Sequence, residues 1–363
     1  MAQPVYFTPG PSELYPGVEE HIQAAMAAKL GSISHRSQQF KSIYAHAVTG
    51  LRKLLALPEN YQILFLSSAN EVWERAIQNT VERESFHLVN GAFSERFFEI
   101  SGELGRSATK YKVPDGEGFD VAQINVPTTA ELIALTQNET STGASMPVAD
   151  IHLFREKASP EALIFVDAVS SVPFPAFDYT KIDAAYFSVQ KCFGLPAGLG
   201  VWLLNERCIQ KAELLLQKGL SIGSYHSIPS LLKKALSNQT PETPNVLNIY
   251  LLGQVVEAMN QKGLDLIRQE TELKARLLYT FLETSKTFAP AVKEAAHRSL
   301  TTIIATTHLP ASEVNNFLAP HHMVVGSGYG QNKETQIRIA NFPAHTVDHV
   351  KALISSLHAL DLA

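Results

Sequence analysis

Two charged side chains, Asp167 and Lys191, each follow a short apolar run. Leu163–Val166 precedes the acid, Tyr186–Val189 precedes the lysine, and the glycine-rich segment Gly194–Gly200 comes after it. Both runs have the length of buried strands, and strands of an α/β sheet open onto a crevice at their carboxyl ends. An amine desolvated among apolar residues loses its proton readily and attacks aldehydes. The pair indicates a Schiff-base lysine beside an acid, although a solvated loop lysine has the same pattern.

Pyridoxal phosphate is a cofactor that uses both groups. Its aldehyde reacts with the amine, and a carboxylate keeps its ring nitrogen protonated so that the ring can accept electrons. The separation of 24 residues (191 minus 167) leaves room for one turn, one connecting segment and a neighbouring strand. Lys191 and Asp167 are therefore the predicted catalytic residues.

The residues around this pair resemble the class V aminotransferases, pyridoxal-phosphate enzymes of fold type I. The similarity is carried by Asp167–Ser171, Ser188–Lys191 and Gly194–Gly200. It extends along almost the whole chain and is greatest to the phosphoserine aminotransferases. The resemblance implies an α/β fold with a large, mostly parallel-sheet domain at residues 15–255 and a small α/β domain made of residues 1–14 and 256–363. It also implies a homodimer with active sites at the subunit interface, acting on small amino acids and 2-oxo acids.

Three further segments resemble cofactor-binding motifs of the family, and Gln190 belongs to the segment Ser188–Lys191 named above. A small-residue turn at a predicted helix start offers free N–H groups and the positive end of the helix dipole to the cofactor phosphate, although a serine-capped turn without a ligand has the same pattern. The family also has an aromatic residue that stacks on the pyridine ring and a threonine near the phenolic oxygen. The expected cofactor-binding residues, besides Asp167 and Lys191, are Ser68, Ala69, Asn70, Phe93, Thr140 and Gln190.

Two more segments resemble those that cross the dimer interface in the family. His35 and Arg36 are expected to reach the partner's substrate pocket, and Thr243 the partner's cofactor phosphate. Without the resemblance, a helix cap and a surface charge explain the His-Arg pair equally well. Arg338 lies in an apolar run, and its planar guanidinium suits the α-carboxylate of an amino acid. A buried structural ion pair is the alternative for Arg338.

Glu71 is the main departure from the phosphoserine aminotransferases, which typically have an arginine there. Its carboxylate is expected near the cofactor phosphate, where two unit charges about 4 Å apart repel by about 4 kcal/mol at an effective dielectric near 20. Arg75, four residues further on, could instead pair with it. The predicted function is amino transfer between glutamate and 3-phosphohydroxypyruvate. The alternatives are a class V transaminase for unphosphorylated serine or alanine with glyoxylate or pyruvate, and a lyase or desulfurase.

Composition excludes several other classes of protein. The 363 residues are 45% hydrophobic and carry a formal net charge of −5, which does not suit a nucleic-acid-binding protein. The apolar runs are too short for a membrane span, and we expect a cytoplasmic protein. The two cysteines, Cys192 and Cys208, are too few for a disulfide scaffold or a cysteine metal cluster, and no metal site is expected. Cys192 is expected to be a packing residue, and neither cysteine suits the mobile reactive position of a desulfurase.

Hydrophobic spacing also predicts the order of the elements. Helices are expected at Val18–Leu30, Phe40–Leu57, Val72–Val81, Arg207–Gln217, Asn245–Gln261 and Leu264–Leu282. Strands are expected at Ile63–Leu66, His87–Val89, Leu132–Thr136 and Gly200–Leu204, with three more near Thr301–Thr306, His322–Val325 and Gln336–Ile339. Phe7–Ser12 and the long polar stretch Tyr225–Pro244 are expected to be irregular.

Overall fold

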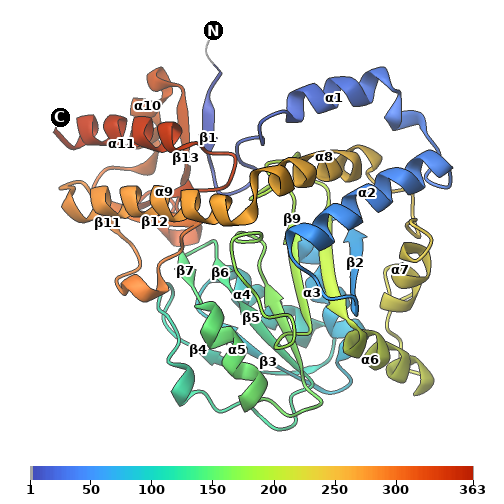
Figure 1. Cartoon of the computed structure of the whole chain (residues 1–363). Coiled ribbons are helices and arrows are strands. Elements are labelled where there is room, and N and C mark those ends of the chain that lie inside the picture. The colour runs from blue at the N-terminus through green and yellow to red at the C-terminus, as the bar shows by residue number, and fades with distance from the viewer. Residues whose placement is uncertain (1–2, 363) are drawn as a thin grey trace.

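A seven-stranded sheet forms the centre of the computed structural model, which describes residues 3–362 (Figure 1). In spatial order its strands are β2 (Tyr61–Leu66), β10 (Gly200–Asn205), β9 (Ala184–Ser188), β8 (Leu163–Asp167), β5 (Leu132–Thr136), β3 (Glu84–Val89) and β4 (Ser107–Lys112). β10 is antiparallel to both of its neighbours, and all other neighbouring pairs are parallel. The predicted mostly parallel α/β sheet is confirmed.

Helices cover both faces of this sheet because its central strands are apolar on both sides. Along β2, Ile63 and Phe65 pack into one core and Leu64 and Leu66 into the other. The first core is covered by α1 (Val18–Ala27), α2 (Gln38–Leu54), α5 (Val148–Lys157) and α8 (Val246–Lys262). The second is covered by α3 (Ala69–Thr80), α4 (Ala92–Glu103), α6 (Glu206–Gln217) and α7 (Ile228–Ala235). The unit is therefore a three-layer α/β/α sandwich.

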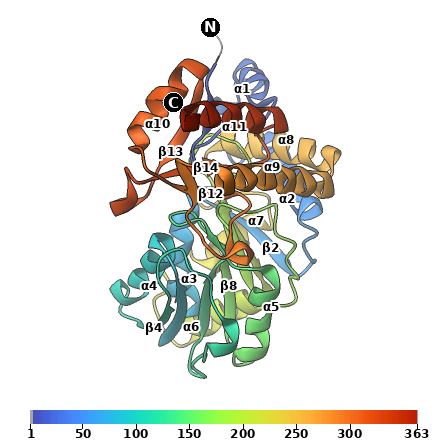
Figure 2. The same cartoon turned by 90° about the vertical axis from the view of Figure 1, so that its left-hand side faces the viewer.

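A second, five-stranded sheet lies above the first in Figure 2. Its strands in spatial order are β1 (Val5–Phe7), β13 (Met323–Ser327), β14 (Gln336–Ala340), β12 (Thr302–Thr307) and β11 (Phe288–Pro290). It shares a separate core with α9 (Leu264–Thr284), α10 (Ala311–Leu318) and α11 (Val347–Leu362). The predicted division at residue 255 falls inside α8, and the domain limits remain a prediction.

Several elements differ from the sequence-based expectations. The stretch Tyr225–Pro244 is not irregular throughout, because it contains α7. Ser227 occupies its N-cap position, Pro229 lies in its first turn, and Ile228 and Leu231 are buried. Strands β1, β4 and β11 were not predicted, and Phe7 belongs to β1. Within residues 3–362, no helix has the length and apolar character needed to cross a bilayer.

Candidate active site

The two predicted catalytic residues lie at the carboxyl edge of the large sheet. β8 ends at Asp167, and its parallel neighbour β9 ends at Ser188, three residues before Lys191. Both side chains line a cavity of about 240 Å³ at this edge. The same cavity is lined by five other residues selected from the sequence, namely Asn70, Phe93, Thr140, Gln190 and Arg338. Folding thus brings together residues that are up to 268 positions apart in the chain (338 minus 70).

Asp167 is held by one hydrogen bond to each carboxylate oxygen. The indole Nε1 of Trp73 donates to Oδ2 at 3.0 Å, and the backbone N–H of Val169 donates to Oδ1 at 3.1 Å. Burial raises the pKa of Asp167 to about 6, although both hydrogen bonds and the nearby Lys191 oppose the rise. At neutral pH the group is therefore an oriented carboxylate with lone pairs left to accept one further N–H.

Lys191 is buried, and its amine is hydrogen-bonded to a pair of linked hydroxyl groups. Its Nζ donates to Thr140 Oγ1 at 2.9 Å. The hydroxyl of Thr140 is in turn hydrogen-bonded to Ser170 Oγ at 2.8 Å. Burial lowers the pKa of Lys191 to about 8, against the attraction of Asp167. Gly10 packs on the aliphatic stem with φ 131°, and a Cβ there would lie 2.9 Å from Lys191 Cγ. The site therefore holds a partly uncharged amine in a fixed position.

The turn predicted to bind a phosphate begins α3. Ser68 is its N-cap, with the hydroxyl accepting from the N–H of Glu71 at 3.3 Å. The N–H of Ala69 already donates to Ser188 Oγ at 3.0 Å, so it is bound within the protein. Asn70 faces the cavity at the same helix end. Of the three residues, Asn70 is the best placed to meet an anion from the cavity.

The position of Phe93 depends on Glu139, whose role the sequence did not indicate. The fully buried carboxylate of Glu139 accepts from the N–H and hydroxyl of Ser94, each at 2.9 Å, and from the hydroxyl of Ser141 at 2.6 Å. It thereby caps the start of α4, and Phe93 projects toward the cavity with its ring centroid 5.5 Å from Lys191 Nζ. Glu139 directly precedes Thr140, so this one acid positions both Phe93 and Thr140 beside Lys191.

Arg338 reaches the cavity from β14 of the smaller sheet. Its Nε donates to the carbonyl of Ser327 at 2.7 Å, and its guanidinium lies 5.5 Å from the centroid of the Tyr329 ring. No carboxylate pairs with it among residues 3–362, so the alternative of a structural ion pair does not apply there. A half-buried guanidinium without a counter-ion is suited to a carboxylate ligand.

His35, Arg36 and Thr243 are not brought to this cavity in their own chain. Arg36 instead donates to the carbonyl oxygens of Thr240 and Pro241, at 2.7 and 3.0 Å. Thr243 is exposed shortly after these residues. The two segments predicted to cross the dimer interface are therefore joined to each other, away from their own Lys191.

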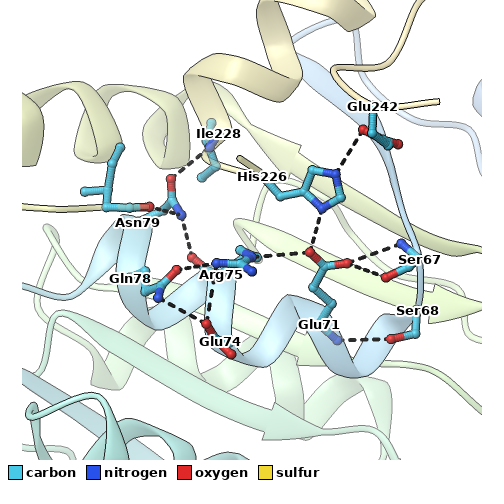
Figure 3. Close-up of polar contacts among 11 residues, drawn as sticks. Ser67, Ser68, Glu71, Glu74, Arg75, Gln78, Asn79, His226, Ile228 and Glu242 are labelled. Atoms are coloured by element: carbon cyan, nitrogen blue, oxygen red, sulfur yellow. Dashed lines mark hydrogen bonds and ion pairs between the residues drawn. The ribbon is translucent and has the colours of Figure 1, made fainter. Parts of the chain in front are cut away.

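Glu71 is not an uncompensated charge. Its carboxylate accepts from Ser67 Oγ at 2.7 Å and from Arg75 Nε at 3.3 Å, and it lies 2.5 Å from His226 Nδ1 (Figure 3). Burial alone would raise the pKa of Glu71, but the hydrogen bonds from His226 and Ser67 outweigh it and lower the pKa to about 2. The pairing with Arg75 is confirmed, and Arg75 and His226 together oppose the repulsion that the Glu71 carboxylate would exert on a phosphate. His226 was missed because it lies in the stretch interpreted as irregular.

The cavity fits the pyridoxal phosphate implied by the sequence. Its lining combines an amine that is partly uncharged, a buried carboxylate for a ring N–H, a flat aromatic face and the start of a helix. The orientation of both Asp167 oxygens by N–H donors suits a third donor arriving from the cavity. A larger cleft of about 810 Å³, near Gly118 and His297, contains none of these groups.

Comparisons with known proteins agree with this geometry. The family model described as aminotransferase class-V matches residues 5–333. A phosphoserine aminotransferase from Corynebacterium glutamicum is 30% identical over 352 residues, which cover 96% of this chain and 92% of that protein. A phosphoserine aminotransferase from Cytophaga hutchinsonii has a solved structure with a TM-score of 0.98 and 58% identity over 99% of both chains. An aspartate aminotransferase from Thermus thermophilus, at 23% identity and a TM-score of 0.85 over 99% of both chains, shares the fold. The chain therefore belongs to the class V aminotransferases, which are pyridoxal-phosphate-dependent transaminases of fold type I.

Proposed function

We propose that this protein is a phosphoserine aminotransferase, which transfers an amino group between glutamate and 3-phosphohydroxypyruvate in serine biosynthesis. The observation that carries the proposal is the 58% identity, over 99% of both chains, to the Cytophaga hutchinsonii protein of that name. The pairing of Glu71 with His226 and Arg75 removes the main objection to a phosphorylated substrate. Small amino acids and 2-oxo acids are the substrates of the family as a whole.

Lys191 and Asp167 carry the chemistry in this proposal. Lys191 would hold the cofactor through Nζ, and Asp167 would hold its ring N–H. Bound pyridoxal phosphate supplies an electron-accepting ring that stabilises negative charge at the substrate Cα. Because the pKa of Lys191 is lowered to about 8, part of its amine is uncharged near neutral pH. The uncharged Nζ would be the base that takes up the proton from the substrate Cα.

The other residues of the cavity bind and orient. Phe93 offers an apolar face for ring stacking, which is worth about 0.5–1.5 kcal/mol beyond burial. Thr140 accepts from Nζ and fixes its direction, and Gln190 lines the cavity beside the lysine. Ser68, Ala69 and Asn70 form the turn assigned to the cofactor phosphate, in which Asn70 faces the cavity and the N–H of Ala69 holds the turn on Ser188. Arg338 is assigned to the α-carboxylate of the substrate, because its charge is not matched by a carboxylate of residues 3–362.

A homodimer completes the proposed site. His35, Arg36 and Thr243 lie outside the cavity of their own chain, and the proposal assigns them to the partner's substrate and cofactor phosphate. The contact of Arg36 with the carbonyls of Thr240 and Pro241 supports this, because it joins the two segments on the exposed surface. The division into domains at 15–255 and at 1–14 with 256–363, and a cytoplasmic location, remain part of the proposal.

The test is a comparison of substrate pairs on the purified holoenzyme. We expect the specificity constant for 3-phosphohydroxypyruvate with glutamate to exceed those for glyoxylate with alanine and pyruvate with serine by at least about tenfold, since one charge-assisted hydrogen bond to the phosphate is worth that factor. Equal or faster turnover of an unphosphorylated pair would contradict the assignment of phosphoserine. Amino-acid elimination in place of transfer would indicate a lyase.

A further inference from the structure

His226 is a buried histidine with a carboxylate on each ring nitrogen. Its Nδ1 lies 2.5 Å from Glu71 Oε1 and its Nε2 lies 3.0 Å from Glu242 Oε2, while the side chain is 4% exposed (Figure 3). The three residues come from separate segments: the first turn of α3, the loop before α7 and the loop after α7. The ring therefore joins segments that are distant in the sequence.

Both ring nitrogens must donate for both contacts to be hydrogen bonds, because carboxylates only accept. The ring is then an imidazolium. Burial alone would lower the pKa of His226, but hydrogen bonds and charge attraction from Glu242 and Glu71 outweigh it and raise the pKa to about 9. The other groups beside the ring are Tyr225, whose ring stacks on it at 4.3 Å between centroids, and Arg75, on the far side of the Glu71 carboxylate. The bridge is thus charged at neutral pH.

The segment that carries His226 is anchored independently of its ring. Asn79 of α3 accepts from the N–H of Ile228 at 2.8 Å (Figure 3). The side-chain amide of Asn79 also donates to the carbonyl of Ile222 at 3.2 Å. These bonds fix the chain on both sides of His226 against α3. The imidazolium is therefore held in a fixed position. Substitution of His226 leaves the hydrogen bonds of Asn79 in place.

Each carboxylate on the ring belongs to an element assigned to phosphate binding. Glu71 accepts from the N–H and hydroxyl of Ser67, and so braces the turn that starts α3. Glu242 lies in the loop 239–243, directly before Thr243. Arg36 also holds this loop, through hydrogen bonds to its carbonyls. One element is assigned to the cofactor phosphate of its own subunit and the other to that of the partner.

We propose that His226 is a positioning residue that holds the loop 239–243 against the first turn of α3, and so couples the phosphate-binding elements of the two active sites. The role of the loop at the partner's phosphate rests on the proposed function, whereas the bridge itself does not. Loss of the imidazolium frees one side of the loop and leaves the carboxylates of Glu71 and Glu242 facing each other without it. Phosphate binding then weakens in both sites of a dimer.

Two substitutions separate the two halves of the bridge. In His226→Asn the amide nitrogen takes the place of Nδ1, so a donor to Glu71 remains and the contact with Glu242 is lost. In His226→Gln the amide nitrogen takes the place of Nε2, so the contact with Glu242 remains. His46→Asn is the control, since His46 pairs with Glu257 at 3.3 Å on an exposed face.

The first measurement is amide hydrogen exchange of the cofactor-free protein at Gln239, whose N–H donates to the carbonyl of Lys234 at 3.0 Å and so reports on opening of the loop 239–243. We expect exchange in His226→Asn to be faster by at least about tenfold, because one hydrogen bond between charged groups is lost. Exchange in His226→Gln should be less affected. The His46→Asn control should match the parent. Parent-like exchange in His226→Asn overturns the proposal. Because this measurement needs neither cofactor nor substrate, it is independent of whether phosphoserine is the substrate.

The second measurement compares pyridoxal phosphate with pyridoxal, which lacks the phosphate. We expect His226→Asn to weaken the binding of pyridoxal phosphate by about tenfold and that of pyridoxal by less than about twofold. An equal loss for both ligands indicates general damage to the fold and overturns the coupling.

A pH series on the parent protein tests the same point without a variant. The preference for the phosphorylated ligand should decline as the pH rises through about 9, where His226 loses its proton. Lys191 bonds to both ligands, so its titration cancels in their ratio. A preference that stays constant from pH 7 to pH 10 would overturn the proposal, and in His226→Asn the decline should be absent.

Discussion

Asp167→Asn should change how the stability of the cofactor-free protein depends on pH. Burial raises the pKa of Asp167 to about 6, whereas the unfolded chain has a value near 3.9. Above both values the carboxylate is ionised in both states, and the folded site carries the penalty of a buried charge. As the pH falls through about 6, the folded protein takes up a proton that the unfolded chain does not yet bind, so stability rises.

The size of the effect follows from these two pKa values. Between about pH 7.5 and about pH 5, proton uptake by Asp167 adds about 1.4 kcal/mol to the free energy of unfolding of the parent. Asparagine cannot take up this proton, so the variant lacks the gain. The rearranged hydrogen bonds to Trp73 and Val169 cost a similar amount at both pH values, and they cancel when the two pH values are compared.

Equilibrium urea unfolding of cofactor-free parent and variant, at one protein concentration and both pH values, measures this difference. We expect the unfolding free energy of the parent, relative to Asp167→Asn, to increase by at least about 1.4 kcal/mol on acidification. Groups away from Asp167, such as His226, contribute equally to both proteins. Lys191 loses the attraction of Asp167 in the variant, so its pKa falls further there and its protonation adds to the difference in the same direction. A relative stability that is the same at both pH values would show that Asp167 does not titrate in this range, and would refute the reasoning.

Three further substitutions test the residues around the cavity. Arg338→Lys keeps the charge but loses the planar fork, so KM for the amino acid should rise by about tenfold with little change in kcat; an unchanged KM would remove Arg338 from carboxylate binding. Phe93→Leu keeps an apolar side chain without a stacking face and should weaken cofactor binding by about two- to tenfold in a titration, whereas parent-like affinity would exclude stacking. Glu139→Gln turns an amide toward the N–H of Ser94 and should lower the free energy of unfolding by about 2 kcal/mol, and a loss well below that value would mean that the cap is dispensable.

The main elements and the catalytic pair could be predicted because their signals are local. An apolar run that ends in one charged residue marked both β8 and the approach to Lys191, and the structure places the two strands side by side. Arg338 was conspicuous for the same reason, as a charge within an apolar strand. These residues are detectable because a charge in a buried segment is costly unless it has a use.

The supporting contacts could not be predicted, because they join residues far apart in the sequence. Trp73 has the spacing of an ordinary core residue on α3, and only the fold brings its Nε1–H to Asp167. Glu139 belongs to a polar turn whose carboxylate could have faced solvent. His226 meets Glu71 across 155 positions, within a stretch whose proline and serines predicted a loop. Those turn residues begin α7 instead, since serine at the N-cap and proline in the first turn also suit a helix start.

The central claim is that Lys191 is the residue to which pyridoxal phosphate becomes attached, and reductive labelling tests it most directly. Purified protein is incubated with the cofactor, reduced with borohydride, digested and analysed by mass spectrometry. We predict one stable label, on the peptide that contains Lys191, and none in Lys191→Ala, because Lys191 is the lysine that lines the cavity with Asp167. Labelling of another lysine, or undiminished labelling of the variant, would contradict the assignment of the active site.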